Sequence, residues 1–214
     1  MGEIPNVEKS QKVEVDYKSI QSTINIFEEV YQYKLDAQDS YDIAQVDKIL
    51  HSHVHKKSYK LNNDKSLLEN PILSKINFSD EAKVFLGQIE LLKQIDSYLG
   101  AKGFLALLKE DVLHASLSVE EKTEIVNRIE FAIAFMEWSK SKTNDITDGW
   151  WRSWGKCVAG IVGGTLTGGV MGAAAGGAFG TVALPLLGTV SGASLGMVVG
   201  AIGGGLSGAA LACD

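Results

Sequence analysis

The side chains best suited to chemistry in this sequence are two cysteines and a group of histidines. Cys157 and Cys213 are the only thiols of the chain. They could form a disulfide in an oxidising setting, and the alternative is two reduced thiols in apolar surroundings. His51 and His55 could share one helix face and offer imidazoles to a metal, but we identify no Cys, Asp or Glu beside them that would complete a site. We therefore expect no metal, and we interpret the histidines as an exposed polar stretch at a helix end.

Catalytic motifs add no further candidates. The sequence contains no nucleophile elbow, P-loop, Cys-x-x-Cys or His-Glu-x-x-His pattern. The net charge is −6 and no basic patch is evident, which argues against nucleic acid as a partner. We predict neither enzyme activity nor a cofactor.

The most unusual stretch lies between the two cysteines, where 57 residues from Cys157 to Cys213 include no Asp, Glu, Lys, Arg or His. Residues four apart stack on one face of a helix, so a glycine at every fourth position makes a smooth stripe on which another helix can pack closely. A pause over Thr181–Leu187 divides the stripe into two ladders. The predicted helix-packing glycines are Gly160, Gly164, Gly168, Gly172, Gly176 and Gly180, then Gly188, Gly192, Gly196, Gly200, Gly204 and Gly208.

Lipid suits this stretch better than water does. Glycine costs about 1 kcal/mol relative to alanine in a helix interior, whereas a bilayer makes helix almost compulsory for the backbone. Cys157–Ala183 and Leu186–Ala212 are each long enough to span a membrane. Pro185 marks a turn between them. We expect an apolar helical hairpin with both cysteines at the same end.

The entry to this stretch, Gly149-Trp-Trp-Arg-Ser-Trp-Gly-Lys-Cys157, is rich in tryptophan. Tryptophan favours the membrane–water interface, and basic side chains attract anionic lipid. The alternative is a hydrophobic anchor that packs the two parts of the protein together. The predicted membrane-interface residues are Trp150, Trp151, Arg152, Trp154 and Lys156.

These residues also carry a resemblance to a known family. The run GWWRSWGKCVAGIVGGTLTGG, the later GAAAGG, the central proline and the terminal GAALAC resemble the class II bacteriocins of the lactobin A/cerein family. The similarity covers residues 149–213. It implies a small secreted peptide that permeabilises bacterial membranes, often with a partner peptide whose glycine-faced helix packs on its own, and it implies an immunity protein in the producer.

The preceding sequence departs from that family. Residues Thr147-Asp148-Gly149 lack the double glycine that ends the usual leader, and about 148 residues precede the peptide-like part. The N-terminal residues have no apolar core typical of an ordinary signal peptide. We expect secretion or delivery to a target-cell membrane by another route.

The first two thirds of the chain are charged and show helical periodicity. We expect helices over 15–35, 41–50, 80–99, 102–114 and 119–139, with Ser79 as an N-cap and Ser118 and Glu121 as a capping box. In the third of these helices, the predicted apolar face includes Val84 and Leu99, and Gly100 suits its C-terminal end. The expected fold is all-α, an N-terminal helical bundle plus a C-terminal Gly-rich apolar helical hairpin. The predicted divisions are a loose 1–13, a soluble helical region 14–139, a linker 140–148 and a glycine-zipper segment 149–214.

Two functions fit this organisation. The first is a bacteriocin-like antibacterial protein whose glycine-zipper helices insert into bacterial membrane lipid and permeabilise it, by self-association or with a partner peptide. The second is a membrane-anchored structural or binding protein with a cytoplasmic helical module, because the basic residues precede the first span. In either case, the helical region could cover the apolar segment before it reaches a membrane.

Overall fold

Five α-helices account for most of the residues that the computed structural model describes, which are 12–37, 40, 42–56, 78–143, 151, 181–184 and 188–191. The all-α prediction is therefore confirmed for the helical region. The elements are α1 Tyr17–Ala37, α2 Ile43–Lys56, α3 Asp80–Ile89, the 3-10 helix η3 Glu90–Gln94, α4 Tyr98–His114, α5 Val119–Ser141, and two short strands, β1 Thr181–Leu184 and β2 Gly188–Ser191.

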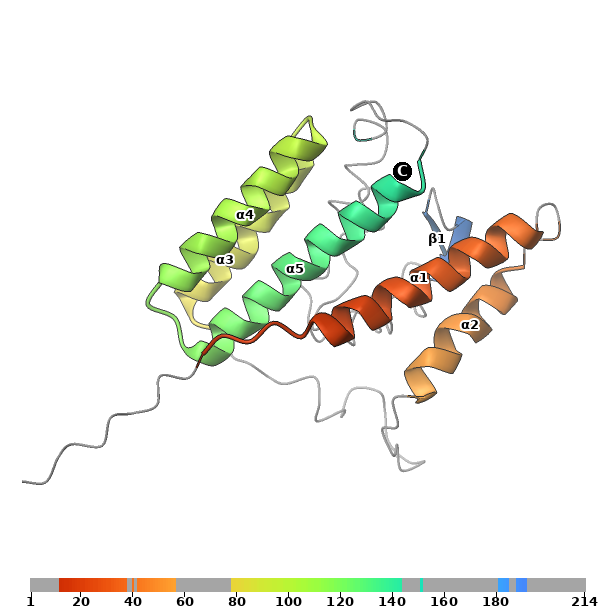
Figure 1. The fold of residues 1–214 in the computed structure, drawn as a ribbon, viewed down its shortest axis with the longest axis horizontal. Helices are drawn as coiled ribbons and strands as arrows, with labels where there is room; N and C mark the ends of the chain where they lie inside the picture. The colour runs from red at the N-terminus through yellow and green to blue at the C-terminus, as the bar shows by residue number, and fades with distance from the viewer. Residues whose placement is uncertain are drawn as a thin grey trace, which may run out of the picture.

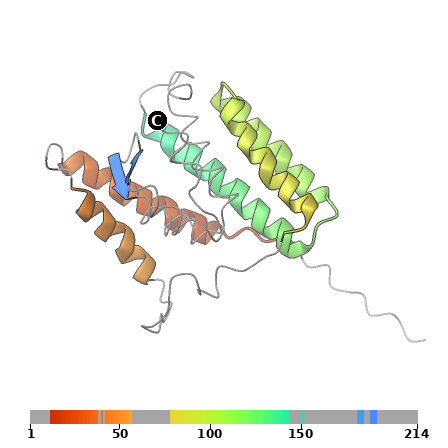
Figure 2. The ribbon, with the colours of Figure 1, turned by 180° about the vertical axis from the view of Figure 1, so that it is seen from behind.

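Helix α5 occupies the centre of this arrangement. Figures 1 and 2 show it between α1 on one side and the antiparallel pair α3 and α4 on the other, with α2 lying along the outer side of α1. Because α5 is covered from two sides, its buried residues exceed one amphipathic stripe. The predicted core residues Ile125, Ile129 and Met136 are buried, and so are Phe131, Phe135 and Trp138.

The start of α5 follows the predicted capping box. The Ser118 hydroxyl accepts a hydrogen bond from the Glu121 backbone N–H at 3.2 Å, and the Glu121 carboxylate accepts one from the Ser118 backbone N–H at 3.1 Å. The same carboxylate accepts a bond of 2.7 Å from the backbone N–H of Ser79, just before α3. The hydrogen bonds from Ser79 and Ser118 outweigh desolvation and lower the pKa of Glu121 to about 2. One carboxylate thus serves two helix starts.

The third predicted helix is wrong in its length. In place of one helix over 80–99, α3 passes into η3, the chain becomes extended at Ile95, and α4 begins at Tyr98. The Ser97 hydroxyl accepts a hydrogen bond of 3.1 Å from the Gly100 backbone N–H, so Ser97 is the N-cap of α4. Gly100 therefore lies in the first turn of α4 and does not end a helix. This local cap competes successfully with continuation of the helix.

The structure also differs from the prediction in which apolar residues of this region are buried. Val84 and Leu99 were expected in the core, but they are 60% and 73% exposed. Ala82, Leu86 and Tyr98 are buried in their place. The interruption changes the helical phase of the residues after it, which explains the exposure of Leu99. Val84 precedes the interruption, and α3 instead buries the face formed by Ala82, Leu86 and Ile89.

Helix α2 is longer than predicted and continues through the histidines to Lys56, so His51 and His55 lie within a helix and not beyond its end. At the other boundary, α5 continues through Lys140 and Ser141, the first two residues of the predicted linker. Val13, expected to be loose, packs partly buried against the helical core.

Among the residues that the structure describes, no group of three metal-ligating side chains is present.

The strands correct the prediction for the centre of the glycine-rich segment. Thr181–Leu184 pairs antiparallel with Gly188–Ser191, with Val182 opposite Val190 and Leu184 opposite Gly188. The chain therefore reverses direction between β1 and β2, and the residues of both strands are extended and not helical. β-Branched residues are common in both strands and favour this conformation. Within the described ranges, no helix combines the length and apolarity that crossing a membrane requires.

Candidate functional site

Trp151 connects the glycine-rich segment to the helical core. It is 1% exposed, and its indole N–H donates a hydrogen bond of 2.7 Å to the backbone carbonyl of Ile95. Its ring meets the ring of Tyr98 edge-on, with 6.3 Å between the ring centroids and 69° between the planes. We call this binding position, formed by Ile95 and Tyr98, the Trp151 seat.

The seat exists because of the break between η3 and α4. Ile95 adopts φ −90° and ψ 122°, so the chain is extended there, and its carbonyl precedes Ser97, whose carbonyl accepts the first hydrogen bond of α4. The Ile95 carbonyl is thereby available to the indole. Glycine at position 100 permits this tight geometry, since a Cβ there would lie 2.8 Å from the Ser97 hydroxyl oxygen and 3.0 Å from Cγ2 of Ile95.

Basic side chains of α4 and α5 lie around the seat. The Lys140 ammonium is 4.2 Å from the centroid of the Tyr98 ring, a cation–π contact from the last turn of α5. Lys102 of α4 forms an ion pair with Glu137 of α5. Burial raises the pKa of Tyr98. The seat therefore joins three elements, η3, α4 and the end of α5.

The free energy involved in docking Trp151 is considerable. Burying a large aromatic side chain removes about 150–250 Å² from water, which corresponds to about 4–6 kcal/mol as an upper estimate. The hydrogen bond to the Ile95 carbonyl pairs the one polar group of the indole, its N–H. Burial of Trp151 therefore does not incur the free-energy cost of an unpaired donor. A contact of this size can hold two parts of a chain together.

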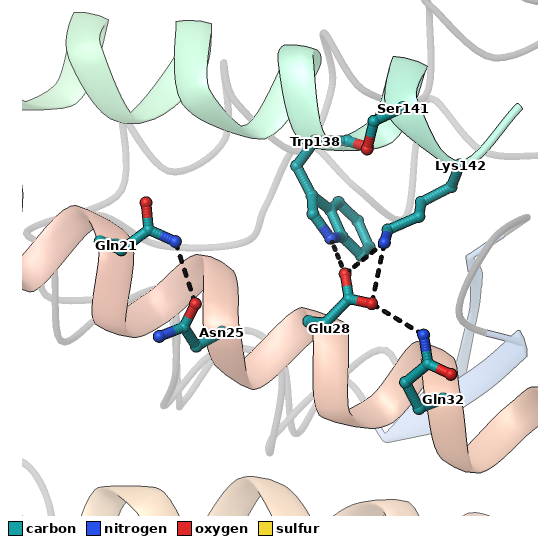
Figure 3. Close-up of polar contacts among 7 residues, drawn as sticks. All are labelled: Gln21, Asn25, Glu28, Gln32, Trp138, Ser141 and Lys142. Carbon is teal, nitrogen blue, oxygen red and sulfur yellow. Dashed lines mark hydrogen bonds and ion pairs between the residues drawn. The ribbon is translucent and has the colours of Figure 1, made fainter.

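A second cluster fixes the C-terminal end of α5 to α1. Figure 3 shows the Glu28 carboxylate accepting hydrogen bonds from the Trp138 indole N–H at 2.7 Å and from Gln32 at 2.8 Å. The Lys142 ammonium lies 2.6 Å and 2.8 Å from the two carboxylate oxygens. The chain therefore leaves α5 from a fixed point, and Trp151 is fixed again nine residues after Lys142.

The Glu28 cluster predicts an acid-sensitive part of the stability. Burial alone would raise the pKa of Glu28, but hydrogen bonds from Lys142, Gln32 and Trp138 outweigh it and lower the pKa from 4.5 to about 2. A carboxylate with a lowered folded-state pKa stabilises the fold above pH 4.5, and this contribution is lost as the pH falls toward 2. Because the side chain is 34% exposed, solvent screening reduces the contribution at neutral pH to about 1–2 kcal/mol.

We therefore expect Glu28→Gln to lower the free energy of unfolding by about 1–2 kcal/mol at pH 7 and to have little effect near pH 2. Urea unfolding followed by circular dichroism at pH 7, 5, 4 and 2.5 measures this. The matched control is Glu110→Gln, which changes an exposed carboxylate of α4. Equal effects of the two substitutions at every pH would contradict the assignment.

Most of the predicted site residues lie outside the described residues. These are Trp150, Arg152, Trp154 and Lys156, both cysteines, and every glycine of the two ladders except Gly188. Gly188 begins β2 and pairs with Leu184, so it is not part of a helix here. Trp151 is buried in the helical core and not exposed for a membrane in this conformation, which agrees with the alternative of a hydrophobic anchor.

The residues that receive Trp151 have a weak signal in the sequence. Ile95 contributes a backbone carbonyl, which any residue type could supply. Ser97 offers the clearer sign, because a serine followed by a new apolar period is typical of a helix start. The pairing of Glu28 with Trp138 and Lys142 joins residues more than 100 positions apart and has no local pattern.

The fold and the seat define a helical protein that holds the beginning of its own glycine-rich segment. Comparison of the chain with protein-family models, with curated proteins and with solved structures gives no match. The resemblance to class II bacteriocins therefore rests on the residues of 149–213 themselves.

Proposed function

We propose that this protein is a bacteriocin-like antibacterial protein that permeabilises target membranes. In this proposal an N-terminal helical bundle, residues 14–139, carries a glycine-zipper segment, residues 149–214, through the linker 140–148. The segment inserts its glycine-faced helices into bacterial membrane lipid, alone or with a partner peptide. The protein would be secreted or otherwise delivered to the target cell, and a producer would need an immunity protein.

One observation carries the proposal: the uncharged, glycine-laddered stretch Cys157–Cys213 follows a tryptophan, Trp151, that is buried in a charged helical region. A large apolar surface exposed to water favours aggregation, so a protein that transports such a segment benefits from covering it. The helical region also lies against the segment at a second place, since β2 packs beside α2. These contacts support a role of the helical region as a carrier of the segment.

The test is dye leakage from vesicles of equal parts phosphatidylglycerol and phosphatidylcholine, comparing the full-length protein with a 149–214 fragment. We expect the fragment to cause leakage at a lower concentration than the full-length protein, because the helical region restrains the segment. If both species bind the vesicles and neither releases dye, the permeabilising function is rejected. A permanent membrane anchor with a helical binding module would then be the better account.

A further inference from the structure

Trp151 has two incompatible environments if the proposed function holds. In the structure its indole N–H donates to the Ile95 carbonyl, and its ring contacts Tyr98 inside the helical core. At a membrane–water interface the same ring would lie among lipid headgroups. One side chain cannot occupy both places, so docking in the seat and contact with lipid exclude each other.

We propose that Trp151 is a releasable anchor, held in the seat in water and transferred to lipid when the protein reaches a membrane. This regulatory role rests on the proposed function. Lipid shifts the equilibrium between docked and released Trp151 only to the extent that it binds the released state more tightly. The free energy of docking in the Trp151 seat therefore sets the lipid concentration at which the protein acts.

The position of the seat suits this role. The hydrogen bond to the Ile95 carbonyl and the ring contact with Tyr98 are not part of the backbone hydrogen bonding of η3 or α4, so release of Trp151 leaves both helices intact. The contacts of α5 with α1 and of α5 with α4 are made between those helices themselves and can persist when Trp151 is released. The anchor can therefore open while the helical region remains folded.

The first experiment follows Trp151 directly in the full-length protein. The other three tryptophans are replaced in Trp138→Phe, Trp150→Phe and Trp154→Phe, and circular dichroism verifies that the helices persist. In buffer we expect Trp151 fluorescence to be protected from acrylamide. With vesicles of equal parts phosphatidylglycerol and brominated phosphatidylcholine, we expect it to be quenched by the lipid.

Two results would overturn the proposal. Trp151 could be accessible to acrylamide in buffer, which would mean that no anchor exists. It could also remain protected from the lipid quencher at saturating vesicle concentration, which would mean that the anchor does not release. Failure of the proposed function is a separate outcome: the 149–214 fragment would cause no leakage, although Trp151 still moved into lipid.

A second experiment keeps all four tryptophans and weakens the seat. Tyr98→Leu removes an aromatic ring that contacts Trp151, and we expect half-maximal leakage by the full-length protein at about two- to tenfold lower concentration. Tyr98→Phe retains the ring and should behave like the wild type. Val112→Ala creates a defect in the same helix, about 21 Å along its axis from Tyr98, and controls for a general loss of stability. Equal gains from Tyr98→Leu and Val112→Ala would contradict a specific role of the seat.

Discussion

Phe135→Ala is expected to lower the free energy of unfolding by about 3–5 kcal/mol, the cost of truncating a buried phenylalanine. Phe135 is 3% exposed and lies at the centre of an aromatic cluster between α1 and α5. Its ring centroid is 5.0 Å from that of Phe27, 5.5 Å from that of Trp138 and 5.9 Å from that of Phe131. Alanine would remove three ring contacts and leave a cavity that close-packed neighbours fill only in part.

The effect is large because whole domains are stable by only about 5–15 kcal/mol. Urea unfolding at pH 7, followed by the helical circular dichroism signal, measures the loss. Leu107→Ala is the control, since Leu107 is 69% exposed on α4 and its truncation should change stability by less than about 0.5 kcal/mol. A loss below about 1 kcal/mol for Phe135→Ala would mean that this cluster is not the core of the helical region.

Gly172→Leu is expected to reduce vesicle leakage by the 149–214 fragment by about tenfold, equivalent to about 1.4 kcal/mol of helix packing. Gly172 lies within the first glycine ladder. If the proposed glycine-faced helices form in lipid, a side chain at this position would hold them apart. Leucine also raises the apolarity of the segment, so a loss of leakage cannot result from weaker partition into lipid.

The control places the same leucine outside the ladder. Ala174→Leu is two residues from Gly172, a rotation of about 200° around an α-helix, and so it lies on the opposite face. We expect this variant to retain leakage. Full activity of both variants in the dye-release assay would exclude packing through the glycine stripe. It would not reject the membrane activity of the segment.

The helices of the charged region could be predicted because their signals are local. Ser118 and Glu121 define the start of α5 within four residues, and apolar residues at three- and four-residue spacing define its course. The N-cap interaction expected of Ser79 is also present, since its hydroxyl accepts a hydrogen bond from the Ala82 backbone N–H.

The break before α4 could not be predicted by periodicity alone, because apolar residues continue through it. Ile95 and Tyr98 both contact the helical core, yet Ile95 belongs to the short extended link between η3 and α4, and Tyr98 begins α4. Propensity describes average behaviour, and here the cap at Ser97 and the close packing at Gly100 decide the local conformation.

The environment of Trp151 required information from distant parts of the chain. Its own surroundings in sequence, two further tryptophans and two basic residues, are typical of a membrane interface. The same apolar ring with one polar N–H also fits a protein interior that offers a single acceptor. Trp151 lies in the protein interior because the fold places the Ile95 carbonyl and the Tyr98 ring beside it.

The Glu121 carboxylate has a consequence for folding cooperativity. It binds the N–H of Ser118 at the start of α5 and the N–H of Ser79 before α3, so the beginnings of two helices share one acceptor. Neither helix start can fray without exposing a carboxylate that the other still binds. Residues 78–121 should consequently behave as one cooperative folding unit. The start of α3 and the start of α5 should unfold together, and α4 lies between them in the sequence.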